Sequence, residues 1–354
     1  MTAMPNIILV GQSFIESRTT QRINALRKIG CDVSVIPTTL ADGGYEARPS
    51  MLTRLRHRLR LPGDPARANA SILNKVAAGA DILWLDNADM VRPATLARAK
   101  EIATNLRILY YTEDDMMNSR LRTRWIEGAF RYLDLWVTTK SYNQAPDELP
   151  AFGMHNILFV NNVAAPEIHR PLRVNDNEAT AFGAPITFIG SFEAPRAHSL
   201  LRLAEANIAV RVWGNGWRHM LEKHPNLRIE GRAIYNLDYA KSISSSAINL
   251  CFLRHQSRDL QTCRSVEIPS CGGFMVHERN SEITSLFRED KEAVYFSSDD
   301  ELIECCRKWA EKSDGRNEIA KNGRRRVQEL NLNHEAQVGE ILTYVKKLNQ
   351  DQKP

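Results

Sequence analysis

The sequence of 354 residues lacks the cysteine patterns that bind zinc or form redox centres. Its six cysteines form no Cys-x-x-Cys pair and have no histidine partners at zinc-site spacing. We therefore expect reduced, mostly buried thiols in a cytoplasmic protein. No signal-peptide pattern precedes the first apolar run, and no apolar run approaches the roughly 20 residues that span a bilayer.

The sequence also lacks a glycine-rich dinucleotide-binding motif after its first strand and a strong net charge. Gly11 stands alone after the first apolar run, without the G-x-G-x-x-G pattern of dinucleotide-binding loops, so we interpret it as part of a sheet-edge loop that faces a ligand. The net charge of +5 is mild. The one strongly basic segment has none of the aromatic platforms that bind single strands, and we expect no nucleic-acid partner.

What the first part of the chain does contain is a series of apolar strands separated by helical patterns. Strands are predicted at residues 6–10, 31–36, 81–86, 107–111, 135–138 and 156–160, with helices at 17–29 and 93–104. Alternation of strand and helix is typical of a parallel sheet covered by helices. We therefore predict an α/β fold and a Rossmann-like N-terminal domain over residues 1–165.

A glycine and several polar residues stand at the ends of these strands or directly after them. They are Gly11 with its loop, Asp86, Asn87, Glu113, Asp114, Asp115 and Asn161. Ligands of open parallel sheets bind at the carboxyl ends of the strands, so this edge is the predicted acceptor side of a site.

The triplet Glu113, Asp114 and Asp115 has three interpretations. Clustered carboxylates can hold Mg²⁺ or Mn²⁺, one of them can act as a general base on a hydroxyl, or they can cap the following helix. Of the three, metal binding is the least favoured, and we predict no metal site. Asp114 and Asp115 are the candidate bases.

The second half repeats the same opening after a linker at residues 164–184 that is rich in proline, acids and small residues. Strands are predicted at 186–189, 209–213, 230–234, 247–252 and 274–276, with helices at 195–206 and 236–246. Gly190 follows the first of these strands, where backbone amides and a helix N-terminus favour a phosphate. Arg196 and Arg264 offer guanidinium groups suited to phosphate. A second Rossmann-like domain is predicted at 185–330.

The stretch from Asp259 to Glu278 combines two acidic residues, Asp259 and Glu267, with Arg264 between them and a Cys-Gly-Gly turn before an apolar run. Glycines at 272 and 273 end helices at little steric cost, and Pro269 keeps the preceding helix short or bent. This stretch resembles the C-terminal half of nucleotide-sugar glycosyltransferases with two Rossmann-like domains facing across a cleft, the GT-B fold.

In glycosyltransferase family 4 a Glu-x7-Glu motif precedes such a turn, and here Asp259 and Glu267 occupy its two positions. The resemblance implies that Asp259 meets the donor sugar and Glu267 the nucleotide ribose. Aspartate differs from the family's glutamate at the first position. A closer resemblance, including Arg264, E-I-P-S-C-G-G-F, Tyr-x-x-Asp-Asp at 111–115 and Asn-Asn-Val-x-x-Pro at 161–166, is to the CgeB-like glycosyltransferases, named after a spore-coat maturation protein.

The resemblance implies transfer of a sugar from a nucleotide-diphosphate sugar to a glycan or glycoconjugate acceptor without a cofactor, in cell-surface polysaccharide or glycoconjugate synthesis. Retention of the anomeric configuration is favoured by family 4, whereas an essential base at Asp114 or Asp115 favours inversion. Arg264 joins these two as a candidate catalytic residue. The implied donor-binding residues are Gly190, Ser191, Arg196, Gly214, Asn215, Tyr239, His255, Asp259, Arg264 and Glu267.

Two further segments carry predictions. The basic run from Arg54 to Arg67, with interleaved leucines, is either a peripheral membrane contact at the inner membrane face, a grip for an acidic acceptor, or a solvated loop with a short helix. Residues 331–354 contain a helix at 335–348 that GT-B proteins pack back on the N-terminal domain. A non-catalytic nucleotide-sugar-binding protein or a surface-assembly protein with the same fold is the alternative function.

Overall fold

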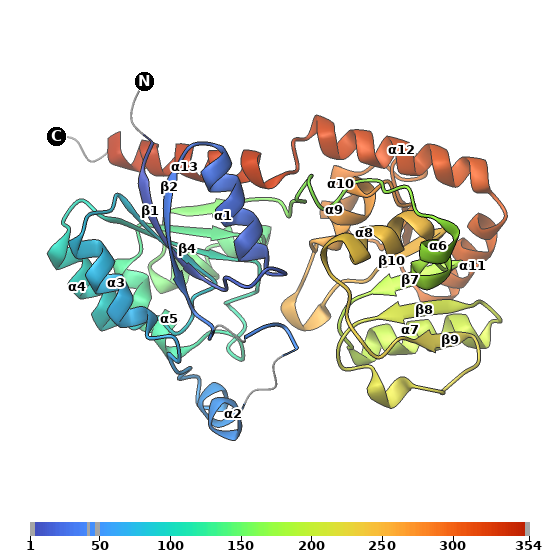
Figure 1. Cartoon of the computed structure of the whole chain (residues 1–354), viewed down its shortest axis with the longest axis horizontal. Coiled ribbons are helices and arrows are strands. Elements are labelled where there is room, and N and C mark those ends of the chain that lie inside the picture. The colour runs from blue at the N-terminus through green and yellow to red at the C-terminus, as the bar shows by residue number, and fades with distance from the viewer. Residues whose placement is uncertain (1–3, 41–42, 47–49, 351–354) are drawn as a thin grey trace. The chain divides into compact units, whose positions relative to one another are not determined.

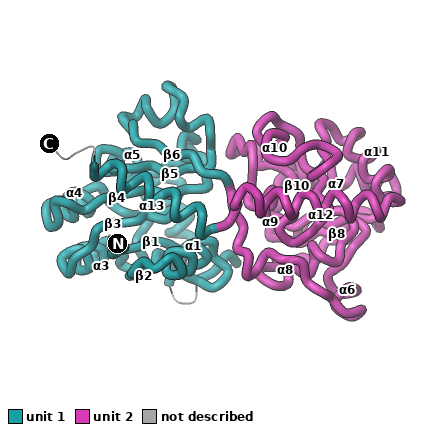
Figure 2. The backbone as a smooth tube through the Cα atoms, turned by 90° about the horizontal axis from the view of Figure 1, so that it is seen from above, with its two compact units in different colours: residues 1–161, 334–354 teal, residues 162–333 magenta. Residues whose placement is uncertain are grey.

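The computed structural model describes residues 4–40, 43–46 and 50–350. The chain forms two compact units (Figure 2). Unit 1 comprises residues 1–161 and 334–354, and unit 2 comprises residues 162–333. Each unit is built around one parallel sheet, so the predicted pair of Rossmann-like domains is confirmed.

The sheet of unit 1 has the strand order β2-β1-β3-β4-β5-β6, and all neighbouring strands are parallel. Its strands are β1 (Asn6–Gly11), β2 (Asp32–Pro37), β3 (Ile82–Asp86), β4 (Arg107–Thr112), β5 (Leu135–Thr138) and β6 (Ile157–Phe159). The strands from β3 to β5 are buried along almost their whole length, which explains their continuous apolar sequences. The strand order reverses between β1 and β3, and this topological switch point is where such sheets bind ligands.

Helices cover both faces of this sheet (Figure 1). The helices of unit 1 are α1 (Arg18–Lys28), α2 (Met51–Arg58), α3 (Ala68–Ala77), α4 (Pro93–Ile102), α5 (Arg124–Ala129) and α13 (His334–Gln350), with short 3-10 turns η1 (Phe130–Tyr132), η2 (Ser141–Gln144) and η3 (Leu149–Phe152). Helix α2 has no buried residue and does not cover the sheet. One face packs Ile8 and Val10 against α3 and α4, and the other packs Ile7 and Leu9 against α1 and α13. The alternation along β1 therefore supplies both halves of the core.

The C-terminal helix α13 packs beside α1, although more than 300 residues separate them in the sequence (Figure 1). Val338, Ile341 and Val345 recur at helical spacing and are buried in the sheet-facing core. His334 Nε2 lies 3.0 Å from Gln21 Oε1 at the start of the contact. The predicted return of the last helix to the N-terminal domain is thus confirmed.

The sheet of unit 2 has the order β12-β11-β10-β7-β8-β9 and is also parallel throughout. Its strands are β7 (Ile186–Ile189), β8 (Val210–Trp213), β9 (Leu227–Ile229), β10 (Ile248–Cys251), β11 (Met275–Glu278) and β12 (Val294–Phe296). Counted within the unit, this is the 3-2-1-4-5-6 order of dinucleotide-binding folds, with its switch point between β7 and β10.

The helices of unit 2 are α6 (Asp176–Phe182), α7 (Ala194–Glu205), α8 (Asn236–Ser245), α9 (Arg264–Ser270), α10 (Ser281–Leu286), α11 (Asp299–Ala310) and α12 (Ser313–Glu329), with the 3-10 turns η4 (Arg218–Met220) and η5 (His255–Ser257). Helix α9 ends before Gly272, whose φ of +73° is the left-handed conformation that favours glycine. Pro269 limits α9 to seven residues, as its sequence predicts.

One predicted strand was wrong. The structure places β9 at Leu227–Ile229, whereas residues 230–234 were expected to form this strand. Gly231 has a φ of +69°, which breaks extended backbone. Glu230 lies just after the strand and accepts a hydrogen bond from Arg211 Nε at 2.6 Å as part of an ion pair.

Candidate functional site

The candidate site of unit 2 begins where β7 ends, at Gly190. The Gly190 amide donates to Trp213 O at 2.8 Å, and the Trp217 indole Nε1 donates to Gly190 O at 2.8 Å. A Cβ atom at Gly190 would lie 2.7 Å from the Phe188 ring, and one at Gly214 would lie 1.9 Å from Gly190 O. Both positions therefore require glycine to bring the ends of β7 and β8 together.

The guanidinium groups of Arg196, which is buried, and Arg264, which is half-buried, lie at this same end of β7. Each has its guanidinium carbon 5.8 Å from the Phe188 ring centroid. A Cβ at Gly190 would lie 3.4 Å from Arg264 Nη1, so this guanidinium borders the glycine loop. Arg196 comes from α7 and Arg264 from the first position of α9. The fold thus brings two arginines from distant segments together at the switch point of the sheet.

The hydrogen-bonding capacity of these two arginines is largely unused within the described part of the chain. Arg196 is only 3% exposed, yet its Nε and Nη2 atoms have no hydrogen-bond partner there, and neither does Arg264 Nε. Arg196 Nη1 donates to Ser191 O at 3.2 Å and lies 3.7 Å from Glu193 Oε1. Arg264 Nη2 donates to Phe252 O at 3.5 Å. Buried donors without acceptors are costly, and an anion would satisfy them.

Burial and neighbouring charges shift the pKa values of Arg196 and Arg264 in opposite directions. Burial, and then the charge of Arg264, lowers the pKa of Arg196 to about 10. Burial also opposes the charge of Arg264, but Cys263, Cys251, Tyr239 and Glu267 raise its pKa above the usual value. Both groups remain cations near neutral pH, so the site presents two positive charges to a ligand.

Glu267 lies on α9 three residues after Arg264 and is 7% exposed. His169 Nδ1 accepts the Ala165 amide hydrogen at 3.0 Å, so Nε2 carries the ring hydrogen of the neutral imidazole and faces Glu267 Oε1 at 3.7 Å. Tyr239 packs edge-on against His169, with ring centroids 5.7 Å apart. The structure therefore brings Glu267 and Tyr239 together through His169.

The remaining predicted donor residues lie around the same strand ends. Asp259 is 8% exposed, with Oδ2 3.7 Å from Arg254 Nε. His255 is exposed and its Nε2 lies 2.5 Å from Glu278 Oε1, so its ring faces the end of β11. Asn215 Nδ2 donates to the Tyr235 hydroxyl at 3.5 Å, and Asn215 O accepts the Phe192 amide at 2.9 Å.

His169, Arg254 and a buried Cys251–His277 pair were missed from the sequence. His277 Nε2 lies 2.8 Å from Ser265 Oγ on α9, and Cys251 Sγ lies 3.9 Å from that same oxygen. Burial opposes ionisation of the thiol, but His277 and Arg264 lower the pKa of Cys251 to about 7. No local signal marks these residues, although His169 follows the Asn-Asn-Val-x-x-Pro segment by three positions.

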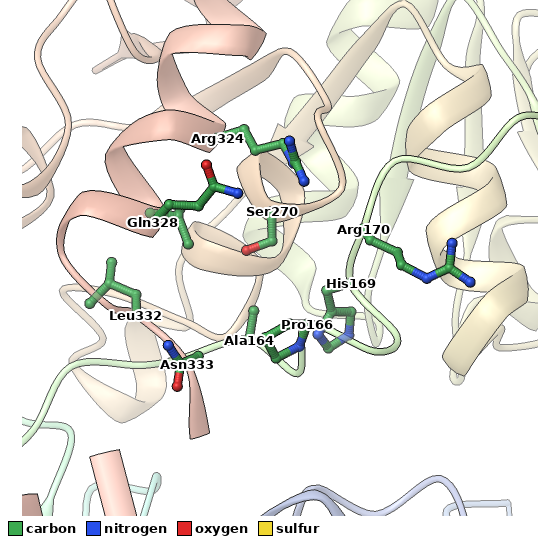
Figure 3. A pocket seen from close by; sticks show the side chains of 10 residues that line it. Ala164, Pro166, His169, Arg170, Ser270, Arg324, Gln328, Leu332 and Asn333 are labelled. Atoms are coloured by element: carbon green, nitrogen blue, oxygen red, sulfur yellow. The ribbon is translucent and has the colours of Figure 1, made fainter. Parts of the chain in front are cut away.

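A small cavity of about 100 Å³ lies beside His169 (Figure 3). Its wall joins the segment Ala164–Arg170 to Ser270 on α9 and to Arg324 and Gln328 on α12. Ser270 Oγ is buried without a hydrogen-bond partner among the described residues. The cavity therefore borders the helix that carries Arg264 and Glu267.

The predicted acceptor edge of unit 1 is organised by an ion-pair network. Arg22 donates twice to Asp86, from Nε to Oδ2 at 2.6 Å and from Nη2 to Oδ1 at 2.8 Å. Arg22 Nη1 and Arg18 Nε each donate to Glu113 Oε1 at 2.9 Å. Burial alone would raise the pKa of Glu113, but Arg18 and Arg22 hold it well below its usual range. Asp86 and Glu113 are thus held as paired carboxylates.

The other predicted residues of this edge have distinct positions. Asp115 is fully buried and its Oδ1 accepts the Met117 amide at 3.1 Å, whereas Asp114 is partly exposed and its Oδ2 accepts from Asn87 Nδ2 at 3.3 Å. Asn161 O accepts from Gln337 Nε2 at 2.7 Å. A Cβ at Gly11 would lie 2.7 Å from Thr19 Cγ2 and 3.0 Å from Asp86 Cβ, so Gly11 lets α1 approach this edge.

The described part of the chain has neither a candidate metal cluster nor a candidate membrane-spanning helix. Within residues 4–40, 43–46 and 50–350, no three histidine, cysteine or acidic side chains gather in an arrangement that could hold a metal ion. In that same part of the chain, no helix is long and apolar enough to cross a bilayer.

Comparisons with known proteins agree with this architecture. Residues 196–342 match the family model described as glycosyl transferase-like. The structure of Anabaena HepE in complex with UDP and glucose aligns over 96% of this chain and 99% of its own, with a TM-score of 0.63 and 12% identity. The chain has the GT-B fold.

Two other GT-B structures align as fully. Sucrose-phosphate synthase from Thermosynechococcus elongatus covers 97% of this chain and 99% of its own, with a TM-score of 0.63 and 12% identity. The α,α-trehalose 6-phosphate synthase from Burkholderia multivorans aligns over 99% of this chain and 100% of its own, with a TM-score of 0.64 and 10% identity. No curated protein matches the sequence significantly.

Proposed function

We propose that this GT-B chain transfers a sugar from a nucleotide-diphosphate sugar to an acceptor hydroxyl. The observation that carries the proposal is the pair of guanidinium groups of Arg196 and Arg264 beside Gly190 and Ser191, in which three nitrogens have no hydrogen-bond partner in the described part of the chain. A diphosphate supplies two negative charges and several acceptor oxygens in the space of one such site. The HepE structure with UDP supports the choice of a nucleotide.

In this proposal the two arginines stabilise the charge that develops on the diphosphate as the bond to the sugar breaks. Glu267 binds the ribose hydroxyls and is oriented by His169, while Asp259 meets the sugar. Gly190, Ser191, Gly214 and Asn215 supply the backbone around the nucleotide, with Tyr239 and His255 at its margins. Arg264 is the residue whose removal should abolish donor binding most completely.

The finer parts of the proposal concern the reaction and its acceptor. We propose a glycan or glycoconjugate acceptor at the unit 1 edge that includes Asp114, a CgeB-like glycosyltransferase role in surface polysaccharide synthesis, and retention of configuration. Asp86 and Glu113 support the edge structurally, because their carboxylates are held by Arg18 and Arg22. Since Glu113 is so engaged, we propose that transfer needs no divalent metal. The six free thiols fit a reducing compartment.

The test is a thermal-shift panel of UDP, GDP, CDP, ADP and dTDP with their common sugars, run with Mg²⁺ and with EDTA. A ligand that binds only the native state raises the melting temperature. We expect one nucleotide to stabilise the wild type and the control Arg218→Ala, which removes an exposed cation of unit 2, but not Arg264→Gln. Glu267→Ala should weaken the same shift.

Transfer is then measured with the nucleotide sugar so identified and a panel of glycan acceptors, with the product anomer assigned by NMR. Donor binding without any transfer or donor hydrolysis would instead favour a nucleotide-sugar-binding protein. If no nucleotide shifts the wild type, the assignment of Arg264 and Glu267 fails and the proposed function with it.

A further inference from the structure

The surface outside the donor site that departs most from an ordinary protein surface is helix α2 of unit 1. None of its eight residues is buried. Met51, Leu52 and Leu55, together with Leu59 just after the helix, are 86%, 57%, 53% and 53% exposed. Figure 1 shows α2 at the margin of unit 1, clear of the sheet. Four large apolar side chains on one exposed helix mark a surface that contacts something else.

The spacing of these residues places them together. Positions 51, 52, 55 and 59 share one face of a helix, since side chains three or four residues apart are neighbours. Arginines occupy the flanks and the opposite face, at 54, 56, 58 and 60. From Ser50 to Arg67 the chain carries five arginines and one histidine against a single acidic residue, Asp64. An apolar stripe bordered by arginines is the pattern of helices that lie in a lipid interface.

The one acidic residue between Ser50 and Arg67 already accepts backbone hydrogen bonds. Asp64 accepts the Ala68 amide at 2.7 Å through Oδ1 and the Asn69 amide at 2.9 Å through Oδ2, and so caps α3. Its single negative charge cannot balance the five arginines of the segment, which therefore remains strongly cationic. This charge complements a negatively charged surface and opposes contact with a second copy of the same helix.

The base of α2 is fixed to the body of unit 1. Arg60 Nε donates to Arg122 O at 2.8 Å and its guanidinium pairs with Glu127. The Arg124 amide donates to Arg60 O at 2.9 Å, and Trp125 Nε1 donates to Pro62 O at 3.2 Å. The apolar side chains thus stay exposed although the end of the helix is anchored, so their exposure is a property of the fold.

Beside this anchor lies an open cavity of about 570 Å³. Three exposed arginines from separate segments line it: Arg56 of α2, Arg67 before α3 and Arg92 before α4. The apolar part of its wall includes Leu59, Leu61 and Trp125, and Asp64 also lines it. The Arg92 guanidinium carbon lies 5.9 Å from the Trp125 ring centroid. Guanidinium groups beside apolar side chains suit the phosphate of a lipid whose chains continue into a bilayer.

We propose that α2 and this arginine-lined cavity form a docking face for a bilayer that contains anionic phospholipids. The apolar side chains of α2 insert between lipid chains, and Arg56, Arg67 and Arg92 bind phosphate headgroups. This face belongs to unit 1 and is built from residues that the proposed donor site does not use. It is therefore testable whether or not the chain transfers sugar.

The experiment is flotation of the full chain with neutral phosphatidylcholine vesicles and with vesicles containing phosphatidylglycerol. We expect binding to the anionic vesicles only, weakened by 0.5 M NaCl. Arg56→Ser/Arg67→Ser/Arg92→Ser should lower the partition coefficient by about a hundredfold, given the usual contribution of each arginine near an anionic surface. Leu52→Ser/Leu55→Ser/Leu59→Ser should lower it by about tenfold or more.

The matched control is Arg218→Ser/Lys223→Ser/Lys321→Ser, which removes the same charge from exposed positions of unit 2 and should bind like the wild type. Every substituted side chain is exposed, so we expect the variants to keep the wild-type melting temperature. An unchanged melting temperature shows that a variant is folded. Equal losses in the control and the Arg56 variant would overturn the proposal in favour of nonspecific charge. Dimerisation in sedimentation analysis that the leucine variant abolishes would overturn it in favour of self-association.

Discussion

The carboxyl edges of the two sheets carry opposite charge arrangements. In unit 1, Asp86 and Glu113 are held by Arg22 and Arg18 with hydrogen bonds of 2.6 to 2.9 Å. In unit 2, Arg196 and Arg264 sit at the equivalent end of β7 with three guanidinium nitrogens that have no partner in the described part of the chain. One edge spends its guanidinium donors on its own carboxylates, whereas the other leaves part of its guanidinium donors without an acceptor.

This difference shows that two units of the same architecture use the charges at their sheet edges in different ways. A matched ion pair stabilises the fold only when both partners are present, because losing one leaves an uncompensated buried charge. Unmatched buried cations cost stability in the free protein and are useful only when a ligand supplies the missing charge. Charge balance at the switch point, more than topology, therefore separates the edge that holds its own ion pairs from the edge that we propose to bind the anionic donor.

The largest expected effect comes from breaking the matched edge. Arg22→Met should destabilise the protein by about 3–5 kcal/mol, because it leaves Asp86 buried without its bidentate partner. The measurement is urea unfolding at pH 7 followed by circular dichroism. Arg98→Met, which breaks an exposed pair with Glu101, should change the free energy of unfolding by less than about 1 kcal/mol. Similar effects of the two substitutions would contradict the comparison.

The reverse result is expected at the unmatched edge. Arg196→Met should leave the free energy of unfolding of the ligand-free protein unchanged or slightly higher, since it removes a buried cation with unsatisfied donors. The same variant should bind the nucleotide about a hundredfold more weakly, as expected for a lost hydrogen-bonded charge pair. Calorimetric titration and urea unfolding of one preparation give both values. A clear loss of stability without ligand would show that Arg196 is structural.

A smaller effect is expected from pH. The pKa of Glu113 is lowered in the folded state, so its stabilising contribution is present above its unfolded pKa and is lost as pH falls below that value. The wild type should therefore lose about 1 kcal/mol more than Glu113→Gln between pH 6 and pH 3.5. Parallel unfolding curves of the two proteins across this range would contradict the ion-pair assignment.

Much of the fold follows from the sequence because its strands are buried on both faces. The apolar runs at β5 and β7 were predicted at their exact boundaries, and the helix-ending glycine at 272 was read correctly. The strand near Glu230 was misplaced because the turn at Gly231 depends on a backbone angle that composition does not reveal.

The candidate site was less predictable because its decisive contacts join distant segments. Asp86 and Glu113 follow strands, and this alone pointed to a ligand edge. Their partners Arg18 and Arg22 lie 64 or more positions earlier on α1, and only the folded chain shows that this helix face covers the edge. By contrast, Arg196 and Arg264 could be proposed from the sequence, since both stand at the start of helices after strands.

The way the chain passes between its units has a consequence for protein engineering. Ala164, two residues after unit 2 begins, and Asn333, at its end, pair with each other in a parallel bridge. Unit 2 is therefore an insertion whose entry and exit are adjacent, as in domains that tolerate transplantation. Residues 162–333 should be exchangeable as one cassette between proteins of this architecture, whereas unit 1 cannot be obtained by truncation, because its last helix is encoded beyond the cassette.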